Sequence, residues 1–104
     1  MENIESTVET ILQATNFQIN KKILKEKIQT DLHIVHNGGM FKITAELIAF
    51  LNLWNESTIY IEDIYENPIC VDREVLLEEA KEQYYKVMNY WHNEYEALKK
   101  NRKL

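Results

Sequence analysis

The sequence predicts an α+β fold, a small antiparallel sheet of two hairpins packed with helices and ending in one long C-terminal amphipathic helix. Three observations predict it. Asn37-Gly38-Gly39 separates two β-rich runs, Glu66-Asn67-Pro68 separates two more, and apolar residues recur at helical spacing across 72–102. We expect the order helix, hairpin, helix, hairpin, long helix, in a single domain of residues 1–104.

The N-terminal segment, residues 1–30, has a weaker helical pattern. Its first apolar residues predict a short amphipathic helix that ends near Asn16. Residues 17–29 are ambiguous, because their apolar positions fit a helical stripe while Lys and Glu fill the gaps. We expect helix that changes to strand near Ile28. The residues of the first stripe are Ile4, Val8, Ile11 and Leu12.

The first hairpin is predicted by an Asn-Gly pair between residues 31–36 and 40–43. Asn and Gly suit a two-residue turn because both of its residues must accept positive φ. Thr44 is placed to cap a helix over residues 45–54. Apolar residues cover more than half of that helix, so we expect it to be deeply buried. They are Leu47, Ile48, Phe50, Leu51 and Trp54.

The second hairpin joins residues 58–64 to residues 69–71, and Glu66-Asn67-Pro68 supplies its turn. Cys70 is the only cysteine and cannot form an internal disulfide. A lone cysteine suits a reducing compartment, so we expect a cytoplasmic protein. The N-terminus has no long apolar run, which argues against a signal peptide or a membrane span.

The long helix is predicted by one apolar stripe with steps of three and four residues. Asp72 is placed as its N-cap, and acidic residues begin the helix while basic residues end it, which matches the helix dipole. The stripe consists of Leu76, Ala80, Tyr84, Val87, Trp91, Tyr95 and Leu98.

This helix is longer than the domain on which it packs. About thirty residues span roughly 45 Å, whereas a compact chain of this size has a radius of gyration of about 13 Å. Its far end therefore needs cover from the N-terminal segment, a second copy or another protein. We predict that residues 88–98 form an interface, most simply that of a homodimer. The expected interface residues are Tyr85, Met88, Tyr90, Trp91, Tyr95 and Leu98.

The formal net charge of −5 argues against a nucleic-acid binder, which needs clustered Lys and Arg. One basic cluster, residues 99–103, leaves a nucleic-acid accessory protein as a weaker alternative. That alternative gains if this cluster lines up with the lysines of residues 21–27 on one face.

No catalytic, cofactor or metal site is predicted. His33 and His36 lie three residues apart on an expected strand, so their side chains point to opposite faces and cannot chelate one ion. The acidic residues around the second hairpin flank a solvated turn rather than a shielded pocket. The main alternative remains a small metal-dependent or acid/base enzyme that uses the two histidines and this hairpin. The acidic residues are Glu62, Asp63, Glu66 and Asp72.

Several short sequence segments resemble those of small uncharacterised proteins of T-even-like tailed phages of marine cyanobacteria and their relatives. The resemblance covers residues 32–102, contains no motif with a mechanism and assigns no catalytic residue. It implies a phage protein made in the host cytoplasm, acting in virion assembly or host takeover. We therefore predict a non-catalytic protein-protein interaction module that binds itself or another phage or host protein. These segments are Asn37-Gly38-Gly39-Met40-Phe41 and residues 46–51, 61–63, 67–69, 88–89, 91–92 and 94–95.

Overall fold

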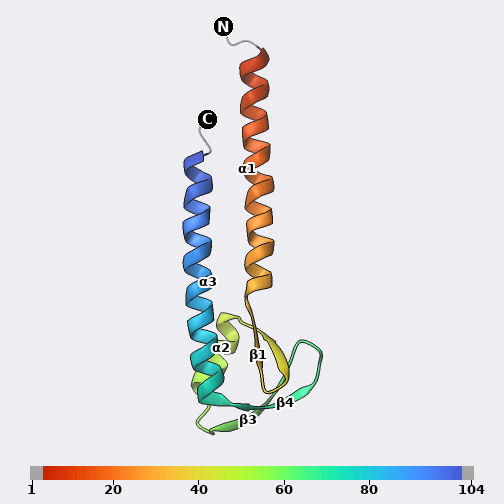
Figure 1. Ribbon diagram of the computed structural model, residues 1–104, viewed down its shortest axis with the longest axis vertical. Coiled ribbons are helices and arrows are strands. Elements are labelled where there is room, and N and C mark those ends of the chain that lie inside the picture. The colour runs from red at the N-terminus through yellow and green to blue at the C-terminus, as the bar shows by residue number, and fades with distance from the viewer. Residues whose placement is uncertain (1–3, 102–104) are drawn as a thin grey trace.

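The computed structural model describes residues 4–101, with side chains from residue 7 onward. Two long helices, α1 (Ile4–Asp31) and α3 (Arg73–Asn101), lie side by side, and the remaining elements gather at one end of the pair (Figure 1). The principal extents are 69 × 23 × 17 Å. The α+β class, the order of elements and the long C-terminal helix are confirmed, and the molecule is a two-helix rod on a small base.

α1 is one continuous helix, so the expected end near Asn16 and the expected change to strand near Ile28 are wrong. The physical reason is that its apolar residues lie on two opposite faces. One face is buried against α3, and the other is exposed. Because a helix turns once in 3.6 residues, such a sequence shows no single stripe. The buried residues are Phe17, Leu24 and Ile28, and the exposed ones are Val8, Ile11, Leu12, Ile19 and Ile23.

The base contains two separate two-stranded antiparallel ladders. One pairs β1 (His33–His36) with β2 (Gly39–Lys42), and the other pairs β3 (Thr58–Glu62) with β4 (Pro68–Asp72). Backbone hydrogen bonding joins the two hairpins, since Ile64 N donates to Met40 O at 2.9 Å. Both predicted hairpins are therefore present and pack together at the foot of the rod.

The Asn-Gly turn forms as predicted, with φ of 49° at Asn37 and 83° at Gly38. Gly39 lies outside this turn and begins β2. A Cβ on Gly39 would lie 2.6 Å from Cγ1 of Ile69, so its missing side chain lets the two hairpins approach each other.

α2 (Ala45–Leu53) begins at the predicted cap, where Leu47 N donates to Oγ1 of Thr44 at 3.0 Å. Its predicted deep burial is wrong, because α2 is short and Leu51 is its only buried residue. Phe50, Leu53 and Trp54 remain exposed. The ring centroids of Phe50 and Trp54 lie 5.7 Å apart, so each of these rings covers part of the apolar surface of the other.

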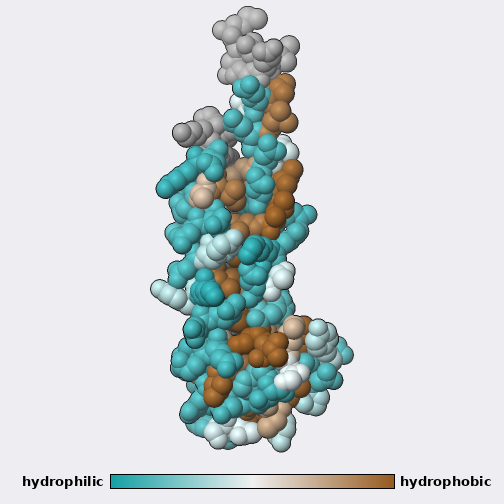
Figure 2. All heavy atoms as spheres, viewed as in Figure 1, coloured by the Kyte–Doolittle hydropathy of each residue, from teal (hydrophilic) through white to brown (hydrophobic). Residues whose placement is uncertain are grey.

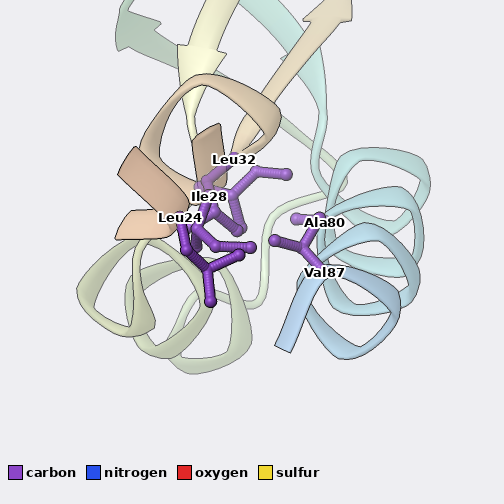
Figure 3. Close-up of a cluster of buried hydrophobic side chains, with 6 residues drawn as sticks. Leu24, Ile28, Leu32, Ala80 and Val87 are labelled. Carbon is purple, nitrogen blue, oxygen red and sulfur yellow. The ribbon is translucent and has the colours of Figure 1, made fainter. Parts of the chain in front are cut away.

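α3 takes part in two hydrophobic clusters. In the first, side chains of α1 face those of α3 (Figure 3). The second lies among α2, α3 and the strands. Asp72 caps α3 as predicted, accepting from Val75 N at 3.3 Å. α3 therefore joins the rod to the base. The buried residues are Leu24, Ile28, Leu32, Ile43, Ala80 and Val87 in the first cluster, and Phe41, Leu51, Val71, Leu76 and Leu77 in the second.

Candidate interaction surface

The outer half of α3 is covered by α1, the first of the three kinds of cover considered above. Met88, Trp91, Tyr95 and Leu98 are partly buried against the cluster shared with α1. The ring of Phe17 tilts by 52° against that of Tyr95, with centroids 6.4 Å apart. This half of the stripe is thus largely occupied within one chain, and what remains open to a partner is its edge.

That edge forms a groove of about 410 Å³ between α1 and α3. Half-buried apolar and aromatic side chains of α3 line it together with exposed Lys21 and Lys25 from α1. Such a groove combines an apolar lining with two ammonium groups that remain in water. The lining residues from α3 are Met88, Trp91, His92 and Tyr95.

The structure brings Met88, Trp91 and Tyr95 of the predicted interface together in this groove. It places the other three predicted residues outside it. Tyr85, 72% exposed, lines a second groove of about 760 Å³ between α2 and α3. Tyr85 and Met88 are three residues apart on α3, so their side chains are neighbours on the helix surface. Leu98 lies at the far end, in a more polar depression with Asn16 and Asn101.

Tyr90 lies on another side of α3, where Lys27 covers it. The Lys27 ammonium is 4.6 Å from the Tyr90 ring centroid and 3.1 Å from a carboxylate oxygen of Asp31. The hydrogen bond to Asp31 and the charge of that carboxylate raise the pKa of Lys27. Lys27 and Tyr90 therefore form a contact between α1 and α3 that is separate from the groove.

His33 and His36, the histidines of the enzyme alternative, have different local partners. Nδ1 of His33 donates to the carbonyl of Thr30 at 2.9 Å. His36 is buried and its Nε2 accepts from Asp72 N at 3.2 Å, while its Nδ1 lies 3.9 Å from a carboxylate oxygen of Glu79. His36 thus ties β1 to the start of α3. Among residues 7–101, no three His, Cys, Asp or Glu side chains are grouped so as to hold a metal ion.

The acidic hairpin is organised around Asp63, whose side chain is buried. Its carboxylate accepts backbone hydrogen bonds from Asn67 N at 2.9 Å, Tyr65 N at 3.0 Å and Met40 N at 3.3 Å. These bonds, led by that of Asn67, lower the pKa of Asp63 although burial opposes them. The oxygens of Asp63 therefore hold the second hairpin closed and attach it to β2, while Glu62 and Glu66 are exposed.

The lysines of α1 lie on different sides of that helix. Lys21 and Lys25 line the groove, whereas Lys27 contacts Asp31 and Tyr90 on another side. Lys99 pairs with Glu96 at 3.2 Å, and residues 102 and 103 lie outside the described residues. Lys99 also lies 5.5 Å from the ring centroid of Tyr95, which lines the groove with Lys21 and Lys25. Within the described residues, the alignment that would favour a nucleic-acid accessory protein is therefore partial, and that alternative stays a hypothesis.

Comparison of the chain with protein-family models, curated proteins and solved structures found no match. Across the described helices, no segment combines the length and apolar character that crossing a membrane requires. The geometry of the surface itself is therefore the basis for inferring a function.

The sequence identified the α3 side of the groove, but it did not identify Lys21 and Lys25. Their spacing of four residues is a usable signal, since it places both on one side of a helix. It becomes informative only once α1 is known to run antiparallel beside α3 (Figure 1).

Proposed function

We propose that the protein is a non-catalytic protein-protein interaction module whose α1 and α3 rod binds another protein chain. The groove lined by Met88, Trp91 and Tyr95 is the observation that supports it. Aromatic residues and Met are enriched at protein interfaces, and the groove offers both. Together with the phage resemblance, this leads us to propose a phage accessory or virion-assembly protein that acts in the host cytoplasm or in the virion.

The groove also indicates the chemistry of its partner. An apolar or aromatic side chain fits against Trp91 and Tyr95, and an acidic group beside it would meet Lys21 and Lys25. Charges at the edge of an interface mainly affect specificity and the association rate. We therefore propose a partner segment that combines a large apolar side chain with Asp or Glu, supplied by a phage or host protein.

Site-specific photo-crosslinking in host cells tests this proposal. A photoreactive residue at exposed His92 should give one discrete adduct, and the same residue at exposed Lys42, on β2, should not. The protein in the adduct, once identified and purified, should bind the wild type. Lys21→Glu with Lys25→Glu should weaken that binding about tenfold or more, since like charges across an interface are costly.

Lys42→Glu is the control, because it makes the charge change of one of these two substitutions outside the groove and should leave the affinity unchanged. Equal adducts from positions 92 and 42, or an affinity insensitive to the charges of Lys21 and Lys25, would contradict the proposed binding surface.

A further inference from the structure

The second apolar face of α1 lies open to solvent along the length of the helix. Val8 is 46% exposed, Leu12 54%, Ile19 51% and Ile23 57%. Figure 2 shows hydrophobic side chains along the edge of the rod that faces away from α3. The residues buried against α3 lie on the other side of the helix, so no part of the described chain covers this stripe. An extended exposed apolar stripe is a common mark of an interface.

Ile11, 59% exposed, lies at the edge of this stripe, and the other four residues have a self-complementary spacing. Val8 and Ile23 are equally far from the midpoint between Thr15 and Asn16, and so are Leu12 and Ile19. A second α1 that lies antiparallel to the first and is centred on the same midpoint therefore has these apolar residues at the same positions along the helix axis. This is the condition for an isologous two-fold interface, in which the same patch of both copies meets itself.

The charges of the segment favour the same arrangement. Residues 1–15 contain three acidic residues and no Lys or Arg, whereas residues 16–31 contain four lysines and two acidic residues. An antiparallel pair places the acidic half of one copy beside the basic half of the other, and it also opposes the two helix dipoles. A parallel pair would instead place the lysine-rich halves of the two copies beside each other.

We propose that a second copy of this chain binds the exposed stripe of α1, antiparallel, with Leu12 of one copy beside Ile19 of the other. The proposed contact uses a side of α1 other than the one that carries Lys21 and Lys25. The groove therefore stays open in the pair. Failure of this proposal would not contradict the proposed function.

Sedimentation equilibrium of the full chain tests the pairing. We expect a concentration-dependent dimer for the wild type and a monomer for Leu12→Gln with Ile19→Gln. Gln has good helix propensity and both sites are exposed, so far-UV circular dichroism should not change. Val35→Gln with Leu53→Gln is the matched control, because it removes two equally apolar exposed residues from the base and should leave the dimer intact.

A monomeric wild type at the highest soluble concentration would overturn the proposal, as would a dimer that survives Leu12→Gln with Ile19→Gln. In the second case, loss of the dimer on Trp91→Ser with Tyr95→Ser would assign self-association to the groove instead.

Disulfide trapping tests the antiparallel orientation in a Cys70→Ser background. Thr15→Cys lies beside the proposed two-fold axis and should form a crosslinked dimer on oxidation. Val8→Cys should not, because two such positions would lie about 22 Å apart along the pair, beyond the reach of a disulfide. Mixing Val8→Cys with Ile23→Cys should restore the crosslink. A disulfide from Val8→Cys alone would indicate a parallel pair and overturn the proposal.

Discussion

Gly38 illustrates a residue whose identity is required by backbone conformation alone. Its φ is 83°, and a Cβ built at this position meets no atom within 4 Å. A side chain at position 38 would therefore destabilise the fold through the positive φ and not through a steric clash. Asn37 tolerates its own positive φ because Asn adopts the left-handed region more readily than most residues, and its Nδ2 donates to Cys70 O at 2.9 Å.

We expect Gly38→Val to lower the free energy of unfolding by about 1 kcal/mol or more, the usual scale for a residue in a strained backbone region. Urea denaturation followed by circular dichroism measures it. Gly38→Asn is the matched control. It should lower the free energy of unfolding by less than Gly38→Val, since Asn accepts this conformation. Equal losses in the two variants would show that φ is not the cause.

Asp63 is a buried carboxylate whose negative charge is held by backbone N–H groups from both hairpins. Its pKa in the folded chain is lowered from an ordinary value of 3.8, chiefly by the N–H of Asn67. Ionised Asp63 therefore stabilises the fold fully above pH 3.8, and this stabilisation is lost as the pH falls through the lower folded pKa.

We expect Asp63→Asn to lower the melting temperature at pH 7, because a neutral amide accepts these hydrogen bonds less strongly than a carboxylate. The difference from the wild type should narrow as the pH falls below 3.8. Thermal unfolding at a series of pH values measures it, with Glu62→Gln as an exposed control. A difference that stays constant down to the most acid pH would contradict the assigned role of the charge.

The elements that the sequence predicts correctly are those with local signals. The Asn37-Gly38 turn, the Thr44 cap and the stripe of α3 each depend on residues within a few positions of one another. α1 lacks such a signal, because its two apolar faces cancel in a search for one stripe. The exposure of Trp54 on α2, and the approach of Lys21 to Trp91, depend on tertiary packing that no local pattern encodes.

The two faces of α1 should differ sharply in their contribution to stability. Ile28 is fully buried and Ile23 is 57% exposed, although both are isoleucines on the same helix. We expect Ile28→Ala to lower the free energy of unfolding by about 2–5 kcal/mol, the range for a buried residue of this size. Ile23→Ala should change it little.

Both variants are compared in the Leu12→Gln, Ile19→Gln background, so that self-association does not contribute, and denaturant unfolding measures the difference. Similar losses at Ile23 and Ile28 would mean that the exposed stripe packs within the same chain.

At the scale of the whole molecule, α3 joins two clusters that differ in shape. The cluster at the base is compact, whereas the cluster between α1 and α3 is drawn out along the rod. Phe17, at the middle of α1, packs its ring against that of Tyr95 on α3. The rod presents a large surface for its mass, which suits the binding along its side that we propose.

This shape gives a direct prediction for small-angle X-ray scattering. The Cα radius of gyration is 19.9 Å, whereas a compact chain of this length would give about 13 Å and an unfolded one about 30 Å. We expect the Leu12→Gln, Ile19→Gln variant, as a monomer, to give a value close to 20 Å, with a scattering profile typical of a rod. A value near 13 Å would mean that α1 folds back onto the base. A value near 30 Å would mean that the whole chain is unfolded, and the groove between α1 and α3 would not exist in solution.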